Sequence, residues 1–142
     1  MSDYVPAELR RLVRERAGNR CEYCLIHEND AFLPHEPDHI IAVKHRGDTT
    51  EGNLAWTCFV CNRGKGSDLA SVDEATGNIV RLYHPRSDSW ADHMELLKDG
   101  SVVARTAIGR VTISLLNLNR PEFLAIRKLL AKSTRKLGWR IE

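Results

Sequence analysis

The stretch Cys58-Phe-Val-Cys61-Asn62-Arg63-Gly64-Lys65 holds two cysteines, an amide and two cations within eight consecutive residues. A second cysteine pair, Cys21-Glu-Tyr-Cys24, precedes it, and Asp38-His39 lies between the two pairs. Cysteines separated by two residues are typical of metal knuckles, and an acid beside an imidazole is typical of catalytic sites. The sequence therefore predicts metal-assisted chemistry on a phosphate, organised around 58–65.

The composition indicates a globular protein. At 142 residues, with 42% hydrophobic and 28% charged residues, the chain is long enough for one domain with a single core. No apolar run approaches the roughly 18 residues of a membrane helix, and the start Met1-Ser-Asp-Tyr-Val-Pro lacks the features of a secretion signal. We therefore expect a cytoplasmic protein, with no membrane partner, whose cysteines stay reduced and bind metal.

The net charge of +2 does not by itself indicate a nucleic-acid partner, but the cations are clustered. Clustered cations can follow a phosphate backbone, whereas the simpler interpretation of each cluster is a solvated helix face. The clusters lie near the start of the sequence, after the second cysteine pair and near its end: Arg10, Arg11, Arg14, Arg16, Arg20, then Arg63, Lys65, then Lys128, Lys132, Arg135, Lys136 and Arg140.

Local patterns in the first half predict helices and short strands. Pro6 suits the first turn of a helix, and Gly18 suits its end. The expected elements are a helix over 6–17, a loop over 25–37, strands over 38–43 and 53–57, and a helix over 58–65. His27 and His35 fall in the loop, where isolated histidines are expected to face solvent.

The sequence beyond Ser67 has the patterns of a scaffold. Asp99-Gly100 between two apolar segments predicts a β-hairpin. Trp56, Trp90 and Trp139 are expected to pack in the interior rather than stack on bases. The other expected elements are a turn over 75–78, a strand over 79–83, and helices over 108–118 and 121–137.

The two cysteine pairs are the strongest metal signal in the sequence. They supply four thiolates, which complete the tetrahedral shell of a zinc ion and leave no open position. Such a site is structural, and it contributes folding free energy to a segment with few apolar residues. The alternative is four free or redox-active cysteines. We predict one zinc ion bound by Cys21, Cys24, Cys58 and Cys61.

Asp38 and Asn62 offer oxygen ligands near this zinc site. Two oxygen ligands completed by water suit a hard cation, Mg²⁺ or Mn²⁺. Such an ion would polarise a phosphoryl oxygen and stabilise the leaving alkoxide, while His39 could take a proton from attacking water. On a regular strand Asp38 and His39 point to opposite faces, so a shared site requires a twisted strand end or a phosphate between them.

These residues resemble the HNH endonucleases, whose ββα-metal site is frequently braced by two cysteine pairs. The resemblance implies that His39 is the general base, that Asp38 and Asn62 hold the catalytic metal, and that Asn53 hydrogen-bonds across the loop to hold the histidine. Many members carry histidine where this chain has Asn62, but the pattern of Asp before the base and Asn at the end also occurs in active nucleases. The resemblance runs from about 20 to 68 and is carried by Cys21, Cys24, Asp38-His39-Ile40, Gly47, Asn53-Leu54, Cys58, Cys61, Asn62 and Lys65.

Three further residues are predicted to contact nucleic acid. Lys65 and Arg63 leave the motif where a phosphate backbone would pass. His45 lies in the loop of the motif, where an additional histidine sometimes approaches the phosphate in the family, and plain exposure is the alternative. Duplex DNA is the expected partner.

The expected fold is α+β: a small ββα-metal core of the His-Me finger type, braced by a zinc site. We expect a single domain over 1–142, with an N-terminal helix, a core at about 18–68 and an extension of a hairpin and helices at about 69–142. A metal-dependent endonuclease is the leading hypothesis. The alternatives are a zinc-braced nucleic-acid-binding module without catalysis and, more weakly supported, an interaction domain stapled by zinc.

Overall fold

The structure is a computed structural model that describes residues 3–131. Contacts within the chain group it into two compact units, each described below by itself. Unit 1 comprises the chain up to Ser67 together with His84–Ser87, and unit 2 comprises Asp68–Tyr83 and the chain from Asp88 onward. The expected end of the last helix, Trp139 and the cations after Lys128 lie outside the described residues.

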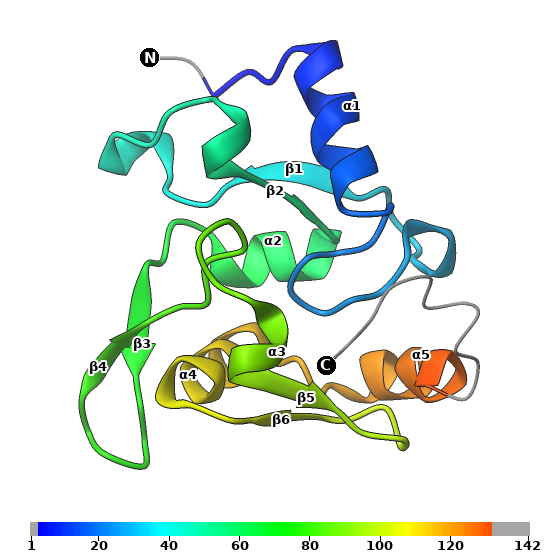
Figure 1. The fold of residues 1–142 in the computed structure, drawn as a ribbon, viewed down its shortest axis with the longest axis vertical. Helices are drawn as coiled ribbons and strands as arrows, with labels where there is room; N and C mark the ends of the chain where they lie inside the picture. Colours follow the sequence, from blue (N-terminus) through cyan, green and yellow to red (C-terminus); the bar gives the residue numbers. More distant parts are fainter. Residues whose placement is uncertain (1–2, 132–142) are drawn as a thin grey trace. The chain divides into compact units, whose positions relative to one another are not determined.

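Unit 1 contains the ββα element. Strands β1 and β2 are antiparallel and pair Asp38 with Ala55 and His39 with Leu54. In Figure 1 this strand pair runs between α1 and α2, and both helices contact it. The elements are α1 (Ala7–Arg16), the 3-10 turn η1 (Glu28–Asp30), β1 (Glu36–His39), η2 (Val43–His45), η3 (Glu51–Asn53), β2 (Leu54–Thr57) and α2 (Phe59–Lys65).

The core of unit 1 forms where α1 packs on the strand pair. Val13, Leu54 and Trp56 are almost fully buried, and partly buried apolar residues of the N-terminal segment pack around them. The position of Trp56 confirms the prediction that it is a packing residue. Its indole also donates a hydrogen bond of 3.1 Å to Glu28 Oε1, which satisfies the buried N–H. This packing holds β2, and therefore its partner β1, against the first helix.

The first strand differs from the predicted range. It was expected over 38–43 but runs over Glu36–His39, and 43–45 form a 3-10 turn instead. The cause is Asn53. Its side-chain oxygen accepts a hydrogen bond from the Ile41 N–H, and its side-chain nitrogen donates one to the Ile41 carbonyl, at 2.9 Å each. These bonds replace the next rungs of the ladder, so strand pairing ends at His39.

Within residues 68–131, unit 2 contains two β-hairpins and three helices. The Asp99-Gly100 hairpin is confirmed, and Gly100 has a φ of 89°, a conformation that suits glycine. Trp90 is 8% exposed, in agreement with its predicted packing role. The elements are β3 (Ala70–Val72), β4 (Ile79–Arg81), α3 (Trp90–His93), β5 (Met94–Leu96), β6 (Val102–Ala104), α4 (Ala107–Leu116) and α5 (Pro121–Ala131).

The mixture of helices and antiparallel strand pairs confirms the α+β class. Strand β3 and helix α3 were not predicted, because both are too short to show a periodic pattern. None of the helices within 3–131 has the length and hydrophobicity that crossing a membrane requires.

Candidate metal and catalytic site

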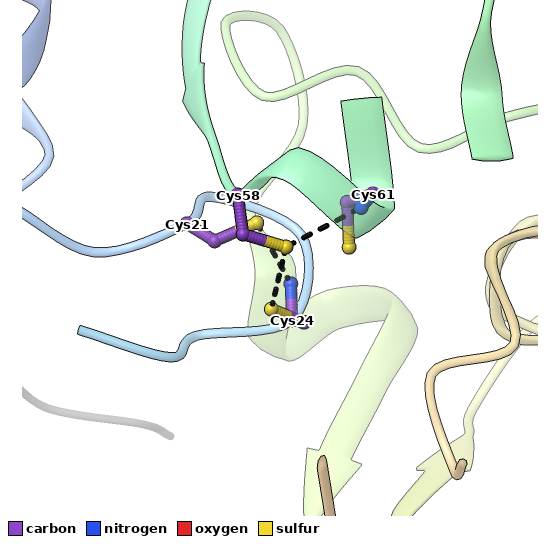
Figure 2. A group of neighbouring side chains, drawn as sticks. All are labelled: Cys21, Cys24, Cys58 and Cys61. Carbon is purple, nitrogen blue, oxygen red and sulfur yellow. Dashed lines mark hydrogen bonds between the residues drawn. The ribbon is translucent and has the colours of Figure 1, made fainter. Parts of the chain in front are cut away.

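The four cysteines come together in unit 1. One pair lies in the turn after α1, and the other lies where β2 passes into α2, with Cys58 as the N-cap of that helix. Figure 2 shows the four sulfurs turned toward a common point. Their Sγ atoms all lie within 4.8 Å of one another, and Cys24 Sγ is 3.7 Å from Cys58 Sγ. Sulfurs at about 2.3 Å from a tetrahedral zinc ion lie roughly 3.8 Å apart, so the cluster fits zinc.

The surroundings of the sulfurs suit thiolate ligands. The backbone N–H of Cys61 donates to Cys58 Sγ at 3.3 Å, and that of Cys24 approaches Cys21 Sγ at 3.5 Å. Such contacts stabilise negative charge on sulfur. Burial raises the pKa of the Cys24 thiol well above its ordinary value, so this thiol stays protonated unless a cation binds. Zinc would supply that cation, and binding would release protons.

His39 lies at the end of β1, next to the loop that joins the two strands. Its Nε2 is 2.8 Å from Thr49 Oγ1, and its backbone carbonyl accepts a bond of 3.1 Å from Lys65 Nζ. The imidazole is therefore oriented at one ring nitrogen by a hydroxyl of the loop. In the tautomer whose Nε2–H donates to Thr49, Nδ1 is the nitrogen that can accept a proton.

Asn53 ties the loop together. Besides its two bonds to Ile41, its Nδ2 donates to the carbonyl of Asp48 at 2.9 Å. Asp48 precedes Thr49, which contacts His39, so Asn53 reaches the histidine through the loop backbone. Gly47 completes this arrangement, because a Cβ there would lie 1.7 Å from the Ile41 carbonyl oxygen. The asparagine thus makes cross-loop contacts of the kind that the family resemblance implied, and Thr49 is a link that the sequence did not reveal.

The Asp38 side chain faces Lys65 of α2, whereas the neighbouring His39 contacts Thr49. Its Oδ2 lies 3.0 Å from Lys65 Nζ, and the two side chains are only 11% and 3% exposed. Burial raises the pKa of the Asp38 carboxyl, and the Lys65 ammonium offsets part of that rise.

The position of Lys65 corrects one prediction. A phosphate contact requires an accessible ammonium, yet the Lys65 residue is 3% exposed and its Nζ also donates to the Gly66 carbonyl at 3.3 Å. Lys65 is an internal cation of the ββα element, because α2 turns this side chain inward against the end of β1.

The remaining predicted site residues lie on or near the surface of unit 1. Asn62 is half-buried on α2, and its Nδ2 is 3.4 Å from Thr57 Oγ1. Arg63 is exposed on the same helix, with its guanidinium 4.6 Å from the centre of the Phe59 ring. His45 is exposed at the end of η2. Among residues 3–131, one group of three or more His, Cys, Asp or Glu side chains is close enough to share a metal ion, and it is the four cysteines.

Two features of unit 1 were missed or mispredicted from sequence. His35 was expected to face solvent but is 1% exposed, because its Nε2 bonds the Ile26 carbonyl at 2.9 Å and its ring lies 6.5 Å from that of Trp56. Arg86 belongs to the His84–Ser87 segment and forms an ion pair with Glu22 of the first knuckle. No local signal indicates either contact, since both join distant parts of the sequence.

Comparison with known proteins supports this description. The HNH endonuclease family model matches residues 21–68, the segment that contains both cysteine pairs and the ββα element. The chain is also 25% identical over 146 residues to the Septu protein PtuA of Bacillus mycoides (strain KBAB4). That match covers 84% of this chain but only 20% of the relative, so the chain spans about a fifth of its length. No solved structure gives a significant match. Residues 21–68 of this chain are therefore similar to the HNH endonuclease family.

Proposed function

We propose that this chain is a metal-dependent endonuclease that hydrolyses phosphodiester bonds in duplex DNA. The observation that carries the proposal is the placement of His39, held by Thr49 at one ring nitrogen and by Lys65 at its carbonyl, at the strand end of an HNH segment. A histidine oriented in this way is preorganised to accept a proton at a defined atom.

In this proposal His39 Nδ1 removes a proton from the water that attacks phosphorus. The Asp38 carboxylate and the Asn62 amide oxygen would hold Mg²⁺ or Mn²⁺, since both are the hard oxygen donors that these ions prefer. When bound, the ion supplies charge stabilisation at the phosphate and the leaving oxygen. Asn53 maintains the loop that orients His39. Arg63 and His45 are the exposed groups assigned to the DNA backbone.

A second candidate is a zinc-braced nucleic-acid-binding module without catalysis. The Lys65 ammonium favours it, because a cation 3.0 Å from Asp38 Oδ2 opposes binding of a metal to the same carboxylate. A binding module, however, has no use for an imidazole oriented by a hydroxyl.

The two candidates are separated by replacing His39. Wild-type protein is incubated with supercoiled plasmid in Mg²⁺ or Mn²⁺, and His39→Ala is expected to nick it roughly 10²–10⁴-fold more slowly, the usual effect of losing a general base. Zinc content and duplex affinity should stay near the wild-type values, because His39 is not a zinc ligand. His27→Ala, at a histidine outside this site, is the matched control and should cleave normally. Equal nicking by His39→Ala and wild type would contradict the assignment of the base.

A further inference from the structure

Lys65 has an unusual environment for a lysine in a nucleic-acid enzyme. It is the last residue of α2, its side chain is 3% exposed, and its ammonium is surrounded by oxygen atoms. Nζ donates to the carbonyls of His39 (3.1 Å) and Gly66 (3.3 Å) and lies 3.0 Å from Asp38 Oδ2. Lysines are rarely buried without a paired charge, and the charge paired with Lys65 is the Asp38 carboxylate.

The same contacts connect Lys65 to both residues of the proposed catalytic pair. One contact holds the backbone of His39, and another faces the carboxylate of Asp38. Asp38 Oδ2 is buried, and the Lys65 ammonium 3.0 Å away is the cation that compensates its charge. Lys65 therefore influences Asp38 by charge and His39 by position.

We propose that Lys65 is the internal counter-cation of Asp38: it holds the strand end that carries Asp38 and His39, and it makes a divalent ion compete with an ammonium for the Asp38 carboxylate. The inference rests on the proposed function for the identity of the ion. It makes Lys65 a positioning residue that sets the divalent-ion affinity of the site. A positive charge at this distance weakens cation binding, so metal would be held loosely and exchange readily.

The test compares thermal unfolding of wild type and Lys65→Met, each with and without Mn²⁺. Methionine keeps the apolar stem but removes the charge. Without Mn²⁺ the variant is expected to melt at a lower temperature, because Asp38 is left buried and unpaired. With Mn²⁺ its melting temperature should rise more than that of wild type, because no ammonium competes for the carboxylate. Calorimetric titration should show tighter Mn²⁺ binding by Lys65→Met, about tenfold or more if the two charges act on a shared ligand.

A double-mutant cycle keeps the test informative if Lys65→Met folds poorly. Asp38→Asn removes the negative partner, so Asp38→Asn/Lys65→Met should recover much of the lost melting temperature and show no Mn²⁺-dependent rise. Arg63→Ala, a cation on the exposed face of the same helix, is the matched control and should leave the Mn²⁺ response unchanged. Zinc content reports that the cysteine site is intact in every variant.

An Mn²⁺-dependent rise in Lys65→Met that is equal to or smaller than in wild type overturns the inference, and so does the absence of a rise in both proteins. Plasmid nicking by wild type is read separately. A chain that nicks plasmid but gives equal Mn²⁺ responses disproves the role of Lys65 and leaves the proposed function intact. A chain that binds Mn²⁺ as expected but nicks no DNA supports Lys65 as the counter-cation and disproves the nuclease.

Discussion

At the scale of single residues, the loop between β1 and β2 depends on Asn53 and Gly47. Asn53 is 9% exposed and uses both its oxygen and its nitrogen to satisfy backbone groups of Ile41 and Asp48. Gly47 has no side chain, and a Cβ at this position would overlap the Ile41 carbonyl oxygen. Both residues shape the loop, and the loop determines where the Thr49 hydroxyl meets the imidazole of His39.

Asn53→Ala is expected to destabilise the protein by roughly 1–3 kcal/mol, because buried backbone groups lose their partners. Gly47→Ala should also destabilise it, since the new methyl group would overlap the Ile41 carbonyl oxygen. Gly52→Ala, where a Cβ meets no atom within 4 Å, is the matched control and should be nearly neutral. Urea unfolding of the three variants measures these changes. A neutral Asn53→Ala would show that the loop does not rely on these bonds.

At the scale of elements, α2 has two chemically different faces. Lys65 points into unit 1, whereas Arg63 stands exposed with its guanidinium over the Phe59 ring. One short helix thus places one cation against Asp38 and His39 and another at the surface. The sequence alone assigned both to phosphate contact, because spacing along the chain does not show which side of such a short helix is covered.

If Arg63 contacts a DNA phosphate, Arg63→Ala should weaken duplex binding at low salt and reduce the slope of log affinity against log salt by about one unit. Lys65→Met should leave that slope unchanged, since its ammonium is buried. Fluorescence anisotropy with a labelled duplex at several salt concentrations measures both slopes. A reduced slope in Lys65→Met would restore Lys65 to the DNA path and contradict its burial.

A second element, the turn between β3 and β4, depends on a single carboxylate in unit 2. Asp73 is 2% exposed; it accepts bonds from Ala75 N–H (3.3 Å) and the Thr76 hydroxyl (3.0 Å), and it forms a two-point ion pair with Arg110 of α4. Hydrogen bonds from the Arg110 guanidinium lower the pKa of this carboxyl from 3.8 to about 2. Because the folded pKa is depressed, the stabilisation is complete above the unfolded value and is lost as the pH falls toward 2.

Arg110→Ala should return the Asp73 pKa toward its ordinary value and move acid unfolding of unit 2 to higher pH. An NMR titration of the Asp73 carboxyl and circular dichroism between pH 5 and 2 record the two effects. Arg105→Ala removes an arginine whose pair with Glu95 is about half exposed on both sides, and it should leave the acid transition in place. An unchanged Asp73 pKa in Arg110→Ala would show that the turn, not the arginine, depresses it.

At the scale of the whole chain, unit 1 is assembled from two separated stretches, the chain up to Ser67 and His84–Ser87. The cysteine cluster joins the turn after α1 to the start of α2, and the ion pair of Arg86 with Glu22 joins the His84–Ser87 segment to the first knuckle. The family match ends at residue 68, so this last contact extends the unit beyond the matched segment. The cysteine cluster and an ion pair thus make connections that the small apolar core does not.

Protein purified without added zinc is expected to contain about one zinc ion per chain. Cys58→Ser should lose that ion and lower the melting temperature, because one of four thiolate ligands is missing and metal binding is coupled to folding. Metal analysis and calorimetry provide the measurements. Stripping zinc from wild type with a strong chelator should lower its melting temperature as well, and returned zinc should restore wild type but not Cys58→Ser. Full zinc retention by Cys58→Ser would rule out the four-cysteine site.

The amino-acid sequence by itself determined the parts of the protein that depend on spacing. Residue types and their spacing along the chain predicted the four-cysteine site, the order strand, strand, helix, and the packing role of Trp56. The structure confirms the clustering, the element order and the burial. Only the tertiary structure decided that Lys65 faces Asp38, that Arg86 reaches Glu22 and that His35 is enclosed. These partners lie far apart along the chain, and a long side chain carries no local signal of its direction. Tertiary packing decides which group lies next to such a side chain, because a buried charge or ring nitrogen requires an opposite charge or a hydrogen-bond partner.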